Sequence, residues 1–185
     1  MSTVRPPSSS LSAPTTSHRA NVKPVESLNW LYHLHYVRNE FDFCVKQIDR
    51  FDFRSEYALY LKGLMALRQH GDVRSALESF NQIRSLNNPT YIKAVVRCFV
   101  LLGRHSNVVD LVRDSALIHS PADWQLWHML GIAYYHLGNV TLAKDAFQHA
   151  LQTTNRTDPF LQLANCHLAE NDAKSAVFVL RRASE

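Results

Sequence analysis

The chain has 185 residues, of which 46% are hydrophobic and 19% charged, and a formal net charge of +4 at pH 7. This composition excludes a wholly disordered chain, and no apolar run approaches the ~18 residues that a membrane span requires. The basic residues are scattered, which does not fit a nucleic-acid-binding stripe. We therefore expect a soluble, cytoplasmic protein with no nucleic-acid partner and no direct membrane insertion.

Residues 1–24 are rich in Ser, Thr and Pro and contain no acidic residue, a composition that predicts a disordered tail. Arginine and serine without acids also fit a mitochondrial presequence loosely. Pro6, Pro7 and Pro14, however, break the amphipathic helix that such a presequence needs. The folded part is therefore expected to span residues 25–185.

The cysteines and histidines form no recognisable metal or redox motif. The three cysteines include no CxxC pair, and their odd number does not suggest a disulfide framework. His33 and His35 lie two residues apart and so point to different sides of a helix. The sequence also has no glycine-rich phosphate loop and no plausible Ser/His/Asp constellation. We expect no metal, no cofactor and no catalytic residues.

Five helix stops recur along residues 25–185, each beginning with Gly or Asn, the residues that most readily adopt the left-handed conformation that ends a helix. The stops are separated by 32, 32, 35 and 33 positions, and they are Asn39-Glu40, Gly71-Asp72, Gly103-Arg104, Gly138-Asn139 and Asn171-Asp172. Each is followed by two small or apolar residues one helical turn apart, which predicts the second helix of a hairpin. The first residues of these pairs are Cys44, Ala76, Val108, Ala143 and Ala176, and the second are Ile48, Phe80, Val112, Phe147 and Leu180.

The fourth unit matches the pattern W-x2-L-G-x2-Y followed by A-x3-F, which is the tetratricopeptide-repeat signature. RNA-binding helical-repeat proteins of similar period lack this pattern and usually carry more basic charge. We predict an all-α, right-handed superhelix of about five helical hairpins, with repeats at approximately 25–56, 57–88, 89–121, 124–157 and 158–185. The residues that carry the signature are Trp127, Leu130, Gly131, Tyr134, Ala143 and Phe147.

Gly131 lies twelve residues before Ala143, where the two antiparallel helices of a hairpin are expected to cross most closely. We interpret the missing side chain as allowing the two backbones to approach each other. The same spacing makes Leu64 the counterpart of Gly131 in the second repeat.

Other local signals fit the same unit. Asn88-Pro89 and Asp158-Pro159 each place a capping residue before a proline, which predicts the start of a helix. Cys98 and Cys166 take the slot of a small alanine in other repeats, so we expect packed residues rather than nucleophiles.

An array of this kind binds partners on the face made by the first helix of each hairpin. The mixture of apolar and basic residues there suits an extended or helical peptide, with Lys93 and Arg97 as the expected anchor for an acidic group. Only the third repeat offers basic residues at these positions, so a co-chaperone type of carboxylate clamp is not expected. The candidate partner-binding groove comprises Asn29, His33, Tyr36, Leu61, Met65, Lys93, Arg97, His128, Ile132, Tyr135, Leu161 and Asn165.

The first repeat has the most distinctive string, Asn29-Trp-Leu-Tyr-His-Leu-His-Tyr-Val-Arg-Asn-Glu-Phe-Asp-Phe-Cys44. It resembles the amino-terminal repeat of the family of the fourth Bardet-Biedl syndrome protein. Further likenesses are Glu56-Tyr-Ala-x-Tyr60, Phe99-x-Leu-Leu-Gly-Arg-His105 and Asp123-Trp124, and the resemblance covers about residues 28–185.

The resemblance implies a non-enzymatic scaffold subunit of the BBSome, a coat-like assembly that carries membrane receptors into and out of cilia. The implied partners are other BBSome subunits and centriolar-satellite or dynactin-type proteins, and the implied locations are the cilium, basal body and centriolar satellites. Family members contain many more repeats, so a fragment or a short isoform is one interpretation of the chain, with Val177 and Leu180 left exposed. The residues alone also leave open a free-standing peptide-binding adaptor outside the cilium.

Overall fold

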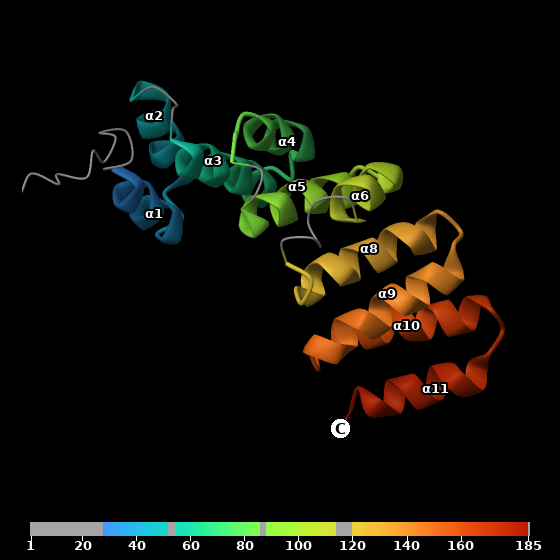
Figure 1. Ribbon diagram of the computed structural model, residues 1–185. Helices are drawn as coiled ribbons and strands as arrows, with labels where there is room; N and C mark the ends of the chain where they lie inside the picture. The colour runs from blue at the N-terminus through green and yellow to red at the C-terminus, as the bar shows by residue number, and fades with distance from the viewer. Residues whose placement is uncertain (1–27, 52–54, 86–87, 114–119, 185) are drawn as a thin grey trace, which may run out of the picture.

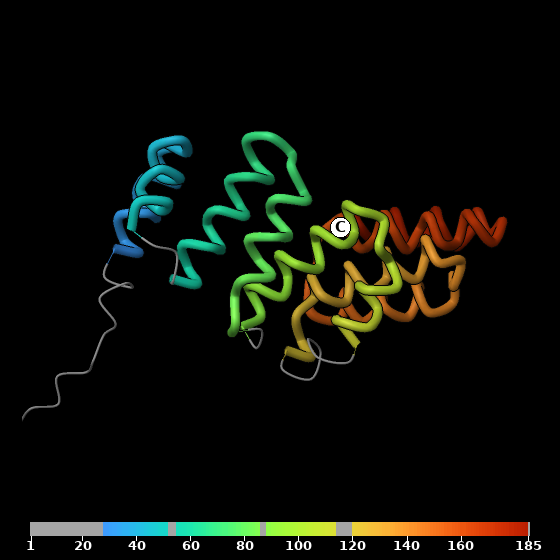
Figure 2. The backbone as a smooth tube through the Cα atoms, turned by 90° about the horizontal axis from the view of Figure 1, so that it is seen from above, coloured from blue at the N-terminus to red at the C-terminus, as the bar shows by residue number. Residues whose placement is uncertain are grey.

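The computed structural model describes residues 28–51, 55–85, 88–113 and 120–184, and these ranges contain ten α-helices and no strand. The helices form five antiparallel hairpins that lie side by side in chain order (Figures 1 and 2). The predicted all-α solenoid is therefore confirmed, whereas the predicted disordered tail, residues 1–24, lies outside the described residues. The hairpins are α1 (Asn29–Val37) with α2 (Phe41–Arg50), α3 (Glu56–Gln69) with α4 (Val73–Asn81), α5 (Pro89–Leu101) with α6 (His105–Leu111), α8 (Trp124–His136) with α9 (Val140–Thr153), and α10 (Thr157–Ala169) with α11 (Ala173–Arg182).

The turn inside every hairpin contains one left-handed residue, and all five are the predicted Gly or Asn. Their φ angles are 59° at Asn39, 61° at Gly71, 68° at Gly103, 81° at Gly138 and 62° at Asn171. These residues end the first helices because they adopt the left-handed conformation at little steric cost.

The second hairpin has one residue more before its turn than the other hairpins. In the fourth hairpin, for example, the Asn139 N–H donates to the Tyr134 carbonyl oxygen five residues earlier, at 2.9 Å. In the second hairpin, the Asp72 N–H instead reaches the Ala66 carbonyl oxygen six residues earlier, at 3.2 Å. Positions of α3 counted backwards from Gly71 are therefore displaced by one residue relative to the equivalent positions of the other first helices.

This displacement corrects the predicted counterpart of Gly131. A Cβ atom at Gly131 would meet the ring of Phe147, and a Cβ atom at Gly63 would meet the ring of Phe80 in the same way. Gly63, and not Leu64, is therefore equivalent to Gly131. The predicted reason was also wrong, because each glycine makes room for an aromatic ring of the second helix rather than for its backbone.

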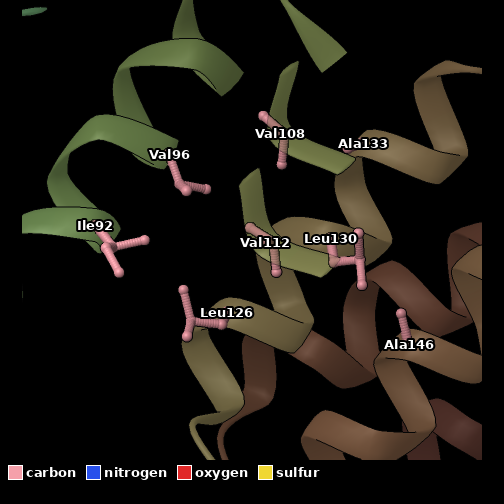
Figure 3. Packing of buried hydrophobic residues seen from close by; sticks show 8 residues of the cluster. All are labelled: Ile92, Val96, Val108, Val112, Leu126, Leu130, Ala133 and Ala146. Atoms are coloured by element: carbon pink, nitrogen blue, oxygen red, sulfur yellow. The ribbon is translucent and has the colours of Figure 1, made fainter. Parts of the chain in front are cut away.

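The buried core is divided among the interfaces between neighbouring hairpins, as expected when no single hairpin can bury its own apolar face. The cluster between the third and fourth hairpins is drawn in Figure 3, and helices α5, α6, α8 and α9 all contribute to it. Its buried members are Ile92, Val96, Val108, Val112, Leu126, Leu130, Ala133 and Ala146.

A helix starts at both predicted places, but only one of the two predicted capping residues is confirmed. Asn88 caps α5 by accepting a hydrogen bond from the Thr90 N–H at 3.0 Å, with Pro89 in the first turn. Helix α10 instead begins at Thr157, so Asp158 and Pro159 both lie inside its first turn. Proline is tolerated there because the first N–H groups of a helix have no partner within it.

The predicted exposure of the last helix is confirmed. Val177 and Leu180 on α11 are 58% and 39% exposed, and Phe178 beside them is 63% exposed. None of the described helices is long and apolar enough to cross a membrane.

Candidate partner-binding surface

The candidate surface is the face formed by α1, α3, α5, α8 and α10, which we call the first-helix face. Ten of the twelve predicted residues on it are exposed or half-buried and so remain available to a partner. They come from four helices: Asn29, His33 and Tyr36 from α1, Lys93 and Arg97 from α5, His128, Ile132 and Tyr135 from α8, and Leu161 and Asn165 from α10.

The prediction is wrong for the other two residues, Leu61 and Met65, because they do not reach the surface. Each is only 1% exposed and belongs to the buried cluster that α3 forms with α1 and α2. The error follows from the extra residue in the second hairpin, which shifts the face of α3 by one position. The half-buried residues Tyr60 and Leu64 take the corresponding places.

Of the two residues predicted as a basic anchor, one is already paired with an acidic residue of the chain. Lys93 forms an ion pair with Asp123, with 2.9 Å between Nζ and Oδ2. Asp123 also caps α8 by accepting a hydrogen bond from the Gln125 N–H, so Lys93 links two repeats. Arg97 is exposed, and no ion pair to it is found among the described residues. Of the predicted pair, Arg97 is therefore the cation that can meet an acidic group of a partner.

His128 is half-buried in the first-helix face. Its ring packs near the rings of Trp124 and Phe147, at centroid distances of 6.2 and 5.6 Å. Burial lowers the pKa of His128, against the smaller opposing effect of Asp158. Within the described ranges its Nδ1 atom is buried without a hydrogen-bond partner. His128 is therefore a neutral, largely apolar element of the surface at neutral pH.

A pocket of about 540 Å³ opens at the N-terminal end of the first-helix face. It is lined by residues of the first three hairpins, and most of them were not predicted as site residues. The chain gave a partial signal, because Trp30 and Tyr57 belong to the strings that carry the family resemblance. The lining residues are Asn29, Trp30, His33, Ser55, Glu56, Tyr57 and Tyr91.

A second pocket, of about 480 Å³, lies between α9 and α11 over α10. Phe160 and Leu163 of α10 lie at it, and Phe178 and Arg182 of α11 line one side. It lies beside the second helices of the last two hairpins, so it is separate from the N-terminal pocket.

The cysteines offer no reactive centre. Cys44, Cys98 and Cys166 are free and buried, and burial raises the pKa of each thiol to about 11. No group of three His, Cys, Asp or Glu residues that could hold a metal ion occurs in the part of the chain that the structure describes. The accessible side chains of the first-helix face carry aromatic, basic and amide groups.

Comparison with known proteins identifies the repeat. The tetratricopeptide repeat family matches residues 124–155, the hairpin of α8 and α9. The structure of MamA (41-end) from Desulfovibrio magneticus RS-1 has a TM-score of 0.76 and 16% identity, covering 86% of this chain and 93% of that one. A thermophilic TPR protein from Thermus thermophilus has a TM-score of 0.66 and 19% identity, covering 86% and 89%. The chain is thus a tetratricopeptide-repeat solenoid.

Curated relatives extend the similarity beyond the fold. BBSome complex member BBS4 of Mus musculus is 29% identical over 191 residues, covering 100% of this chain and 36% of the relative. The Xenopus tropicalis member is 32% identical over 160 residues, covering 83% and 30%. The chain therefore spans about a third of the length of the curated relatives it matches. These matches confirm the family resemblance, and we identify the chain as a BBS4-family sequence.

Proposed function

We propose that the chain is part of a BBSome subunit that acts as a non-enzymatic scaffold in ciliary membrane-protein trafficking and cilium assembly. The observation that carries the proposal is the similarity to BBS4 of Mus musculus over 100% of this chain. The fold supports it, because the first-helix face presents polar and aromatic side chains that the core does not use. In this proposal the repeats span approximately 25–56, 57–88, 89–121, 124–157 and 158–185.

The proposed partners are other BBSome subunits, together with centriolar-satellite or dynactin-type proteins. The proposed locations follow from these partners: the cytoplasm, the cilium, the basal body and centriolar satellites. All of these partners would be held by surface contacts, with the first-helix face as the main contact surface.

Copurification tests the proposal. The chain is co-expressed with the other BBSome subunits of the same organism, and the complex is followed by size-exclusion chromatography. The folded state of the chain is verified by its helical circular dichroism and cooperative melting. We expect coelution with at least one subunit. A folded chain that elutes alone in the presence of every subunit contradicts the proposal.

A second candidate is a free-standing peptide-binding adaptor outside the cilium, and the exposed cation of Arg97 favours it. The probe is a short fluorescein-labelled peptide of alternating Glu and Leu residues, followed by fluorescence anisotropy. Arg97→Glu should abolish binding, whereas Lys46→Glu, an equal charge change at an exposed position of α2, should leave it intact. Lys93 is left unchanged because its removal would break the ion pair with Asp123. Equal affinities of both variants contradict the adaptor.

A further inference from the structure

The N-terminal pocket has three aromatic residues among its lining side chains. Trp30 of α1 is 66% exposed, and Tyr57 of α3 and Tyr91 of α5 are half-buried. The pocket therefore presents both an indole and phenol rings to the same space, and the three rings come from three successive hairpins.

The tyrosine rings are held in place by their neighbours. The Tyr57 hydroxyl and His33 Nδ1 are hydrogen-bonded at 2.6 Å. Tyr60 lies between the two lining tyrosines, with its ring centroid 6.4 Å from that of Tyr57 and 5.1 Å from that of Tyr91. Burial raises the pKa of Tyr57, so its ring stays neutral at physiological pH. These contacts order the two tyrosine rings before a ligand arrives.

The charge of the pocket is negative. Glu56 is the only Asp, Glu, Lys or Arg among the described residues that line it. Its Oε1 atom accepts hydrogen bonds from the Arg84 and Ser85 N–H groups, at 3.2 and 3.1 Å. These bonds fix the carboxylate at the pocket wall, and no bond to its Oε2 atom is found within the described ranges. A fixed carboxylate with one oxygen to spare can accept a hydrogen bond from a cation.

Aromatic faces beside a fixed carboxylate favour a planar cation. The π faces attract positive charge, and a guanidinium both stacks on rings and donates to a carboxylate, which an ammonium group does less well. We propose that this pocket binds an arginine side chain of a partner segment, stacked on Trp30 and hydrogen-bonded to Glu56. The proposal rests on the proposed role of the first-helix face in binding partners. The partner segment would then carry an arginine for this pocket as well as an acidic residue for Arg97.

The test is an NMR titration of the full chain that follows the indole N–H resonance of Trp30. The probes are the peptides Ac-Gly-Arg-Gly-NH2 and Ac-Gly-Cit-Gly-NH2, in which neutral citrulline replaces arginine at nearly the same shape. We expect a saturable shift with the arginine peptide and about tenfold weaker binding of the citrulline peptide, since the charge carries the interaction. Equal affinities of the two peptides overturn the proposal, and so does the absence of any shift.

Two variants, followed through the other shifted resonances, locate the binding. Glu56→Gln keeps an oxygen for the two N–H groups but removes the charge, and Trp30→Ala removes an exposed ring that the core does not need. Both should lose arginine binding. Glu78→Gln on α4 and Phe178→Ala on α11, which is 63% exposed, are matched controls that should retain it. Unchanged binding in Trp30→Ala, or in a folded Glu56→Gln, overturns the proposal. Because no BBSome subunit takes part, this failure would leave the copurification result unaffected.

Discussion

The ring of Phe147 lies against the backbone of Gly131, where an added Cβ atom would come within 2.5 Å of the ring atom Cε1. The ring of Phe80 makes the same contact with Gly63 in the second hairpin. These two contacts fix the rotation of α8 and α3 relative to their partner helices. They therefore determine which residues of α8 and α3 reach the first-helix face.

Alanine at Gly131 should destabilise the chain even though alanine is the better helix former. Overpacking costs about 1–3 kcal/mol, whereas the gain in helix propensity is about 1 kcal/mol. Urea unfolding followed by circular dichroism measures the difference. Alanine should cost less in a Phe147→Leu background, because the smaller side chain leaves room for a methyl group. A more stable Gly131→Ala variant would contradict the contact.

The corrected register of α3 predicts unequal effects at two adjacent positions. Met65→Ala removes a fully buried side chain and should lower the free energy of unfolding by about 2–5 kcal/mol. Leu64→Ala should cost less, because Leu64 is only half-buried. Urea unfolding of both variants decides the matter. A larger loss of stability in Leu64→Ala than in Met65→Ala would contradict the corrected register and support the one counted from Gly71.

Asp123 should contribute to stability mainly as a helix cap. Asp123→Asn keeps a capping side chain and loses only the partly exposed ion pair with Lys93, so the cost should stay below about 1 kcal/mol. Asp123→Ala also loses the cap, which adds about 0.5–2 kcal/mol. Thermal melting of both variants measures the two contributions. Equal losses would show that the cap contributes nothing.

Stability should fall as the pH drops below about 6.5, the ordinary pKa of histidine. Burial lowers the pKa of His105, helped by His136, whose ring stacks on it at 4.5 Å between centroids. Burial also lowers the pKa of His128. The unfolded chain therefore binds these protons more readily, so acid favours unfolding and neutral pH favours the folded chain.

Thermal melting between pH 7.5 and 5.5 tests this dependence, well above the range in which carboxylates titrate. His105→Gln and His128→Gln should each reduce the loss of melting temperature on acidification. His70→Gln, a change at an exposed histidine at the end of α3, should leave the loss unaltered. A melting temperature that rises on acidification would contradict the lowered pKa values of the two histidines in the folded chain.

The buried thiols should resist modification in the folded chain. The pKa of each thiol is raised to about 11, so little thiolate is present at pH 8. Absorbance with dithionitrobenzoate should show almost no reaction without denaturant and three thiols in guanidinium chloride. Rapid reaction of a native thiol would contradict the packing around it.

The features that could be predicted from the sequence depend on local chemistry. Gly and Asn at the five turns are recognisable because few other residues adopt a left-handed conformation readily. For this reason the number of hairpins and most of the first-helix face were predicted.

The features that were missed depend on contacts between repeats or on exact helix length. Because α3 has one extra residue before Gly71, Leu61 and Met65 lie in the core rather than on the first-helix face. In the sequence, only Gly63 indicated this change of register. The pairing of Lys93 with Asp123 joins two repeats, and spacing within one repeat does not show it. The aromatic pocket likewise needs residues from three hairpins.

Site-specific photocrosslinking within a copurified complex tests most directly whether the first-helix face is the partner-binding surface. Benzoylphenylalanine replaces Arg97 on α5 or Asn165 on α10, and in the control it replaces Leu142, an exposed residue of α9. We expect crosslinks to another BBSome subunit from positions 97 and 165 and few from position 142. Crosslinks from position 142 alone would contradict it.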